Sequence, residues 1–367
     1  MNNLRVIIAG GGTGGHIFPA IAVGKALQRL QPGTQLLFVG ALGKMEMEKV
    51  PQAGFNIIGL DIAGFNRSNL LKNITLPFKL IKSRMQAKKI IREFNPGAVV
   101  GVGGYASFPM LQAAQSMGIP TLIQEQNSHA GKSNRILARR AKSVCVAYAN
   151  MEQFFPAEKI ILTGNPVRTE ITDIDVVADV AKEGYGLDAE MKTILVIGGS
   201  LGAKSINEAI DAGLEELMAQ NVQLIWQTGT PYYEQAKAKA EKFGSRVVVV
   251  NFIKEMGHAY AAADVVISRA GALAIAELCI VGKPVIFVPY PFAADDHQKA
   301  NARALVTNEG ALMIADNEAA TTLITKVIAL LRDDNMQKNM SRNLKAMAIK
   351  DADERIANKV IAIANNS

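Results

Sequence analysis

The sequence predicts an α/β protein of two domains, each built on a doubly wound parallel sheet. Apolar runs typical of buried strands alternate with helical stretches in both halves of the 367-residue chain, a length that suits about two domains. A glycine-rich turn also follows an apolar run and opens a helix three times, at residues 10–16, 101–105 and 198–203. Such turns place backbone N–H groups and a helix N-terminus beside a ligand, and they favour phosphate.

The first half of the chain alternates strands with helices. Pro19 falls in the first turn of the first expected helix, where its missing N–H has no partner to lose. Parallel strands joined by helices require right-handed crossovers, so this pattern predicts a doubly wound sheet. The expected strands are 5–9, 35–39, 56–60, 98–102 and 121–124, and the expected helices are 18–29, 44–50, 70–94 and 108–117.

A change of composition marks the boundary between the halves. After the turn at Gly164-Asn165-Pro166, residues 170–190 carry seven acidic residues and one basic residue. We therefore expect an N-terminal domain over 1–164, a C-terminal domain over 165–345 and a last helix over 346–367 that packs back on the N-terminal domain. In the second half the expected strands are 193–197, 223–227, 246–250, 265–268 and 284–288, and the expected helices are 204–219, 232–243, 273–280 and further helices to the end.

The composition is that of an ordinary folded protein, with 49% hydrophobic and 20% charged residues. Cys145 and Cys279 have apolar neighbours, so we expect buried reduced thiols rather than a disulfide or a metal site. A strand starts close to Met1, and no run reaches the about 18 apolar residues of a membrane helix. We therefore expect neither a signal peptide nor a transmembrane segment.

Two common explanations of a glycine-rich turn fit this chain poorly. Gly10, Gly12 and Gly15 satisfy G-x-G-x-x-G, but a dinucleotide site also needs an acid about 20 residues further on, and the first acid after this turn is Glu46. A P-loop needs a final Gly-Lys-Ser/Thr, and neither the first nor the third turn has all of it. An NTPase is therefore disfavoured, and a dinucleotide-dependent oxidoreductase is a distant alternative.

Five side chains stand where such a fold would present them to a ligand. His16 ends the first turn, and histidine suits proton transfer near neutral pH, although a capping or core histidine is the ordinary alternative. Glu125 and Asn127 follow a strand at the edge where open α/β sheets bind ligands. Arg168 suits a pyrophosphate unless it is a surface arginine. Glu277 follows a further strand–turn–helix segment, and a carboxylate there can bind two vicinal ribose hydroxyls.

Seven motifs in order make the chain resemble the family of peptidoglycan glycosyltransferases that convert lipid I to lipid II. The resemblance implies a GT-B fold, in which two Rossmann-like domains face each other across a cleft. It implies transfer of GlcNAc from UDP-GlcNAc to the C4 hydroxyl of MurNAc on lipid I (undecaprenyl-pyrophosphoryl-MurNAc-pentapeptide), with inversion. We expect no metal or other cofactor, because the amides of the glycine-rich turns, the helix N-termini and Arg168 can stabilise the charge of the departing UDP. The motifs are 10–16, 101–107, 125–127, 164–168, 198–203, 268–273 with Glu277, and 297–298 with Asn301.

The resemblance also implies a role for each motif residue. It assigns the C-terminal domain to the donor and the N-terminal domain to the acceptor and the membrane. Ser200 and Arg168 would contact the pyrophosphate, and the backbone at Ile253 the uracil. Gln298 and Asn301 would hold the GlcNAc hydroxyls. The donor would also be lined by Ala272, Leu273, Ala274, Ile275, Ala276 and Glu277, with Glu277 on the ribose, and the N-terminal domain would complete the site with Thr13, Gly14, Gly15 and Asn127.

His16 is our hypothesis for the general base, or lies beside it, with Glu125 orienting or substituting for it. An inverting transfer needs such a base to take the proton of the acceptor hydroxyl. Two other functions on the same fold stay open. One is a glycosyltransferase with another lipid acceptor, such as a diacylglycerol, and the other is a UDP-sugar epimerase.

A basic stretch suggests contact with an anionic membrane surface. Residues 64–92 carry eight basic residues and no acid, interleaved with apolar ones. Such a stretch suits an anionic leaflet, at about 1 kcal/mol for each basic residue close to the lipid. Nucleic acid fits less well, because aromatic residues are scarce in this stretch and no nucleic-acid motif accompanies it. We expect peripheral attachment near 73–81, at the cytoplasmic face of the plasma membrane, with Leu80, Met85 and Ile90 facing the core.

Overall fold

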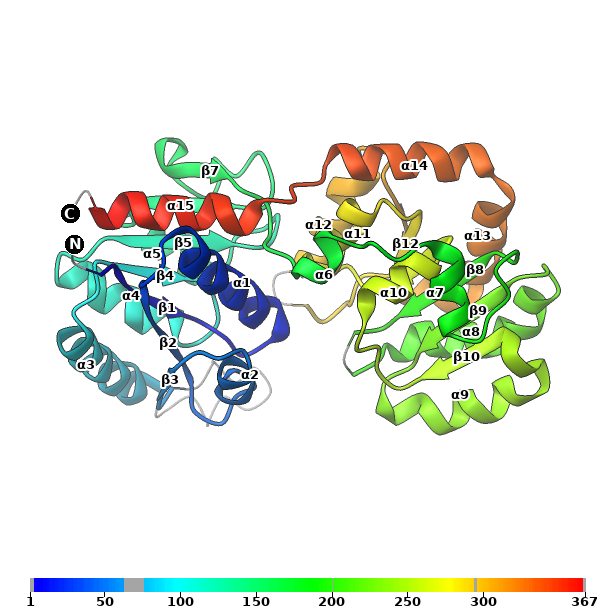
Figure 1. Cartoon of the computed structure of the whole chain (residues 1–367), viewed down its shortest axis with the longest axis horizontal. Helices are drawn as coiled ribbons and strands as arrows, with labels where there is room; N and C mark the ends of the chain where they lie inside the picture. Colours follow the sequence, from blue (N-terminus) through cyan, green and yellow to red (C-terminus); the bar gives the residue numbers. More distant parts are fainter. Residues whose placement is uncertain (1–2, 63–75, 200, 294–295, 366–367) are drawn as a thin grey trace. The chain divides into compact units, whose positions relative to one another are not determined.

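Two separate parallel sheets organise the chain in the computed structural model, which describes residues 3–62, 76–199, 201–293 and 296–365 (Figure 1). Unit 1 holds Met1–Val167 and Ile349–Ser367, and unit 2 holds Arg168–Ala348. The sequence places the corresponding boundaries at 164/165 and 345/346. Unit 1 is therefore assembled from two segments of the chain, whereas unit 2 is one continuous segment.

The sheet of unit 1 has seven parallel strands in the order β3-β2-β1-β4-β5-β6-β7. Helices cover both of its faces, so its central strands are continuous apolar runs rather than alternating ones. In β1, for example, the residues from Val6 to Ala9 are almost completely buried. The strands are β1 (Arg5–Ala9), β2 (Gln35–Ala41), β3 (Ile57–Leu60), β4 (Ala98–Gly101), β5 (Thr121–Glu125), β6 (Ser143–Val146) and β7 (Ile160–Leu162).

The second segment of unit 1 supplies a helix that completes its core. Figure 1 shows α15 lying beside α1. Ile356 and Val360 of α15 are buried in the same apolar cluster as Leu27 of α1. Ion pairs from Arg29 to Asp353 and Glu354 at the surface flank this contact and contribute little. The helices of unit 1 are α1 (Gly14–Leu30), α2 (Glu46–Gln52), α3 (Leu76–Phe94), α4 (Ser107–Ser116), α5 (Lys132–Ala138), the short η2 (Ala157–Lys159) and α15 (Ala352–Asn365).

The sheet of unit 2 has six parallel strands in the order β10-β9-β8-β11-β12-β13. They are β8 (Thr193–Ile197), β9 (Gln223–Gln227), β10 (Val247–Val250), β11 (Val265–Ser268), β12 (Val285–Phe287) and β13 (Leu312–Met313). Its α-helices are α6 (Thr169–Thr172), α7 (Ala178–Gly184), α8 (Lys204–Met218), α9 (Tyr233–Ala240), α10 (Met256–Ala262), α11 (Ala272–Val281), α12 (His297–Val306), α13 (Ala319–Arg332) and α14 (Asp334–Ala346). Short 3-10 turns are η3 (Thr230–Tyr232), η4 (Glu241–Arg246) and η6 (Asp316–Glu318).

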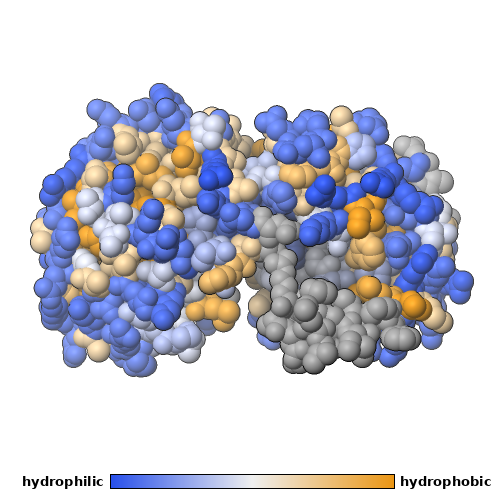
Figure 2. Space-filling view, turned by 180° about the vertical axis from the view of Figure 1, so that it is seen from behind, coloured by the Kyte–Doolittle hydropathy of each residue, from blue (hydrophilic) through white to orange (hydrophobic). Residues whose placement is uncertain are grey.

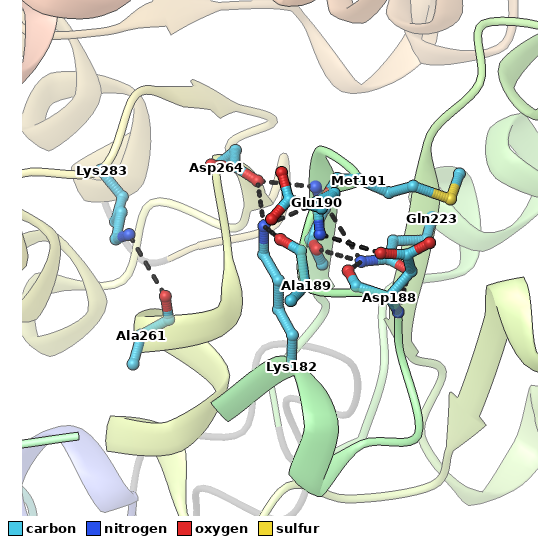
Figure 3. A network of polar contacts seen from close by, with 10 residues as sticks. Lys182, Asp188, Ala189, Glu190, Met191, Gln223, Ala261, Asp264 and Lys283 are labelled. Carbon is cyan, nitrogen blue, oxygen red and sulfur yellow. Dashed lines mark hydrogen bonds and ion pairs between the residues drawn. The ribbon is translucent and has the colours of Figure 1, made fainter. Parts of the chain in front are cut away.

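A polar network lies at the end of the unit 2 sheet where its strands begin (Figure 3). Lys182 of α7 is buried, and its Nζ donates to Ala189 O at 3.1 Å and to Met191 O at 2.9 Å. The same Nζ lies 3.4 Å from Asp264 Oδ2, which also accepts the backbone N–H of Thr193 at 2.7 Å. The network therefore joins α7 to the amino-terminal ends of β8 and β11, on the side of the sheet opposite to the carboxyl ends of its strands.

Two differences from the expected elements matter for the site. α1 begins at Gly14 rather than at residue 18, because Thr13 is extended and acts as the N-cap; Gly14, Gly15 and His16 therefore lie in its first turn. Glu125 is the last residue of β5 rather than the first residue after it.

Other elements were not predicted because they are short: the strands β6, β7 and β13 and the helices α5, α6, α7 and α10. Residues 70–75 of the expected basic helix lie outside the described residues.

Candidate functional site

Both sheets bring glycine-rich turns to the place where their strand order reverses. In unit 1, β1 and β4 are neighbours, and the turns 10–12 and 101–104 follow them. In unit 2, β8 and β11 are neighbours; Gly198 and Gly199 follow β8, and Gly271 lies in the turn after β11. Open α/β sheets bind ligands outside the carboxyl ends of the strands at such a switch point. Each unit therefore has one candidate site.

The turn after β1 is closed by hydrogen bonds within unit 1. Gly10 N donates to Val39 O (3.0 Å), Gly11 N to Gly103 O (3.2 Å) and Gly12 N to Glu46 Oε2 (2.7 Å). The other carboxylate oxygen of Glu46 accepts the N–H of Ala41 at 2.9 Å, and Glu46 is buried. These three N–H groups of the turn are committed to the protein, so the anion site expected from the sequence does not use them.

Close packing of the chain on itself explains why this region requires glycine. A Cβ on Gly11 would lie 2.3 Å from Glu46 Cδ, and a Cβ on Gly40 would lie 2.4 Å from Glu46 Cγ. Gly104 has a φ of +83°, and a Cβ there would lie 2.0 Å from Gly11 O. Both distances to Glu46 are far below an ordinary contact, so Glu46 and the glycines fit only together.

The start of α1 gathers four of the residues predicted to bind or react. Thr13 is exposed, and Gly14, Gly15 and His16 are half-buried in the first turn of this 17-residue helix. The positive end of the helix dipole lies here. The ring of His16 packs against the second glycine-rich turn, since a Cβ on Gly103 would lie 2.8 Å from His16 Cε1. Both glycine-rich turns of unit 1 thus meet at His16.

Glu125 is an acceptor with four hydrogen bonds at the end of β5. Its Oε1 accepts from the backbone N of Asn127 at 3.1 Å and from Asn127 Nδ2 at 3.3 Å. Its Oε2 accepts from the backbone N of Gly131 at 3.1 Å and from Asn134 Nδ2 at 2.8 Å. Burial raises the pKa of the Glu125 carboxyl above its ordinary value, and these hydrogen bonds oppose the rise. Such a carboxylate holds the loop with Asn127 in place.

The turn after β8 in unit 2 is fixed by the neighbouring strand end. Gly202 has a φ of +77°, and a Cβ there would lie 1.9 Å from Thr228 O. Gln227 Nε2 donates to Gly199 O at 2.9 Å. The N-cap residue of α8 is Ala203, which has no polar side chain to cap the first N–H groups of this 15-residue helix. The start of α8 therefore suits an anion. Ser200, expected at the pyrophosphate, lies outside the described residues.

Arg168 and Glu277 are brought together beside α11. Arg168, the N-cap residue of α6, places Nη2 3.1 Å from Glu277 Oε1 and Nη1 2.8 Å from Glu170 Oε1. The other oxygen of Glu277 accepts the hydroxyl of Tyr260 at 3.0 Å. Burial raises the pKa of the Glu277 carboxyl, whereas Arg168 and Tyr260 oppose that rise. Arg168 thus balances the charge of a buried carboxylate in addition to the role expected for it.

Arg269 fixes the turn that precedes α12. Its Nη1 donates to Val288 O at 2.9 Å and to Pro289 O at 3.2 Å, and it also pairs with Asp316. The side chain of Gln298 accepts the backbone N–H of Tyr290 in the same turn at 2.9 Å.

The other residues expected at the donor lie on nearby elements of unit 2. Asn301 is buried in α12, and Ile253 is buried in the loop between β10 and α10. The first turns of α11 carry Ala272, Leu273, Ala274, Ile275 and Ala276, of which Ile275 is buried and the others are half-buried.

Sequence reasoning assigned no role to Glu46, Tyr260 and Arg269, which hold functional candidates in place. Their partners are distant in sequence: Glu46 bonds Gly12, and Arg269 bonds the turn after β12. Arg269 belongs to the motif 268–273, and its position directly after β11 is the sequence feature that could have indicated its role. No local pattern marks the other two.

Within the described ranges, no group of three or more His, Cys, Asp or Glu residues is arranged to hold a metal ion. Among the described helices, none is long and apolar enough to span a bilayer.

Comparison with known proteins identifies relatives along almost the whole chain. Residues 6–146 match the model of the glycosyltransferase family 28 N-terminal domain, and residues 193–356 match that of the C-terminal domain.

Two curated relatives are named UDP-N-acetylglucosamine--N-acetylmuramyl-(pentapeptide) pyrophosphoryl-undecaprenol N-acetylglucosamine transferase. The one from Phocaeicola vulgatus is 50% identical over 99% of this chain and 97% of its own. The one from Parabacteroides distasonis is 48% identical over 99% of both chains. The crystal structure of Acinetobacter baumannii MurG has a TM-score of 0.80 and 31% identity, covering 98% of this chain and 99% of its own.

Proposed function

This chain belongs to glycosyltransferase family 28, and we propose that it transfers GlcNAc from UDP-GlcNAc to the C4 hydroxyl of MurNAc on lipid I, with inversion, to give lipid II. It is a UDP-GlcNAc-dependent N-acetylglucosaminyltransferase of peptidoglycan synthesis with a GT-B fold. The observation that carries the proposal is the identity of about half of all residues with relatives of that name over nearly full length.

Unit 2 is our proposed site for the donor. The start of α8 suits the diphosphate, and Glu277 suits the two hydroxyls of the ribose. Ser200 and Arg168 would contact the pyrophosphate, the backbone at Ile253 the uracil, and Gln298 and Asn301 the sugar. Departure of UDP leaves negative charge, which the preorganised dipole of α8 and the guanidinium of Arg168 would stabilise without a metal.

Unit 1 would supply the base and bind the acceptor. In this proposal His16 removes the proton from the acceptor hydroxyl, and Thr13, Gly14, Gly15 and Asn127 complete the site. Glu125 holds the loop that carries Asn127. Loss of one positioned base costs about 10²–10⁴ in rate. His16→Ala should therefore lower kcat by that factor and leave the Kd for UDP unchanged; near-full turnover would contradict the assignment.

Transfer of label from radiolabelled UDP-GlcNAc to a lipid I analogue, with and without EDTA, tests the whole proposal. Labelled lipid that forms equally with EDTA supports the transfer and the metal-free mechanism. Labelled lipid that forms only without EDTA supports the transfer and refutes the metal-free departure. UDP release without labelled lipid favours another lipid acceptor or an epimerase.

We also propose peripheral attachment of unit 1 to an anionic membrane surface through α3. Figure 2 shows the general distribution on one face of the protein, where apolar areas lie among hydrophilic ones on each unit. Ile81 and Met85, one turn apart on α3, are 62% and 68% exposed, among basic residues such as Lys79 and Lys82. Of the residues expected to face the core, Ile90 is buried, whereas Met85 and Leu80 are exposed, because the buried face of α3 runs through positions 83, 87, 90 and 91.

Co-sedimentation with vesicles tests this attachment. Reversal of the charges at Lys79 and Lys82 should lower binding to vesicles that contain anionic lipid. Unchanged binding would refute the attachment. Arg67 and Lys72 of the same stretch, and residues 73–75 of the expected contact, lie outside the described residues.

A further inference from the structure

Tyr260 is a buried side chain that no step of the proposed reaction uses. It lies on α10, is 1% exposed, and its hydroxyl donates to Glu277 Oε2 at 3.0 Å. Burial and the neighbouring charge of Glu277 raise the pKa of the Tyr260 phenol well above its ordinary value, so the hydroxyl keeps its proton and remains a donor.

The hydrogen bonds to Glu277 leave it with a defined remaining capacity. An ionised carboxylate has two oxygens with about four acceptor positions in total. Arg168 takes one position on Oε1, and Tyr260 takes one on Oε2. About one position therefore remains on each oxygen. Two acceptors side by side on one carboxylate match the two vicinal hydroxyls of a ribose.

The two partners also fix how the carboxylate is turned. The terminal torsion of a glutamate side chain is broad and has no strong preference of its own. Arg168 and Tyr260 hold opposite oxygens, so they fix this torsion from two sides. The remaining acceptor positions are thereby preorganised, which reduces the entropy lost when a ligand binds.

We propose that Tyr260 is a positioning residue for the nucleotide, which holds Glu277 so that both of its oxygens accept ribose hydroxyls and thereby distinguish ribo- from deoxyribonucleotides. This inference rests on the proposed function, because it takes Glu277 as the ribose contact. A hydroxyl that served packing alone would affect stability without affecting this discrimination.

Titration with UDP and with 2′-deoxy-UDP by calorimetry tests the inference. Tyr260→Phe removes the hydroxyl and conserves the ring. Hydrogen bonds to charged groups contribute enough that we expect the Kd for UDP to rise about tenfold, while the Kd for 2′-deoxy-UDP changes much less. The preference for UDP should therefore fall toward one. In turnover, KM for UDP-GlcNAc should rise and kcat should change little.

Tyr232→Phe is the matched control. The Tyr232 hydroxyl also donates to a carboxylate of unit 2, Asp211 Oδ2 at 2.8 Å, and Asp211 has no assigned role in binding. This variant should keep the Kd for UDP and the preference for UDP.

A double-mutant cycle keeps the test decisive if Tyr260→Phe folds poorly. A neutral amide at position 277 costs less to leave without the Tyr260 donor than a carboxylate does, because an unsatisfied charged group carries the larger penalty. If Tyr260 acts only through Glu277, the double variant Tyr260→Phe with Glu277→Gln should bind UDP as Glu277→Gln alone does. A further loss in the double variant, or a preference for UDP unchanged in Tyr260→Phe, would overturn the inference. Failure of the wild-type protein to bind UDP would instead overturn the proposed function.

Discussion

Replacing Glu125 by glutamine would show whether this carboxylate acts as a base or as a fixed acceptor. The substitution conserves shape and converts one carboxylate oxygen into an NH₂ group. Each oxygen accepts two N–H groups at 2.8–3.3 Å, so the new NH₂ must face two donors in either orientation. Two hydrogen bonds to a charged group are lost, and two donors that are buried or part-buried lose their partner.

The expected loss of stability follows from that count. A hydrogen bond to a charged group contributes about 1.5–3 kcal/mol. Two such bonds give about 3–6 kcal/mol, and relaxation of the loop 126–134 brings the expected value to the lower end, about 3 kcal/mol. Asn134→Ala removes one donor and leaves Gly131 N on the same oxygen, so it should cost about half as much.

Urea unfolding measures the stability, and turnover is compared at a temperature at which both proteins are folded. We expect a clear loss of stability in Glu125→Gln together with changes in both KM and kcat. A fall of kcat by 10² or more with stability unchanged would refute the role as a fixed acceptor, since that is the expected behaviour of a general base.

Three further predictions concern unit 2. Gly202→Ala should destabilise unit 2 by more than about 2 kcal/mol and weaken UDP binding, because its Cβ would meet Thr228 O. In the control Gly184→Ala the new Cβ meets no atom within 4 Å, so this variant should be tolerated. Thermal unfolding of both variants, with and without UDP, measures the difference. Lys182→Met removes the donor of Ala189 O and Met191 O and the cation beside the partly exposed Asp264, so it should cost about 1–3 kcal/mol in urea unfolding. The folded variant should keep the Kd for UDP, and weaker UDP binding would contradict the placement of this network away from the donor. The pKa of the Glu277 carboxyl is raised in the folded state, so the folded protein binds this proton more tightly than the unfolded chain does. The contribution of Glu277 to stability therefore falls as pH rises from the ordinary pKa of 4.5 through the folded pKa. UDP affinity, measured by calorimetry, should rise over the same pH range, and an affinity independent of pH there would contradict the ribose contact.

The fold could be predicted where buried strands are long enough to form a distinct apolar run. β8, β9 and β11 have the expected bounds, since their residues are buried on both faces. The missed strands, such as β7 with three residues, are too short for periodicity to show. The start of α1 was misplaced because glycine has a low helix propensity, and Gly14 and Gly15 resemble a turn more than a first helical turn.

The candidate site could be predicted only in its local parts. The motifs place His16 at a helix start, Glu125 at the carboxyl end of a strand and Glu277 within the helix that follows a strand, and local pattern can show all three positions. Their hydrogen-bond partners come from elsewhere in the chain and depend on tertiary packing. Glu46 is one example, because it bonds a turn 34 residues earlier in the sequence.

The assembly of unit 1 from two segments has a consequence for the order of events during synthesis. Residues 349–367 leave the ribosome after all of unit 2, yet Ile356 and Val360 belong to the core around α1. Unit 2 can therefore complete its fold while unit 1 still exposes the apolar face that α15 will cover. The part of unit 1 that is synthesised first therefore stays incompletely folded for the longest time, so a chaperone that protects this protein would act on unit 1.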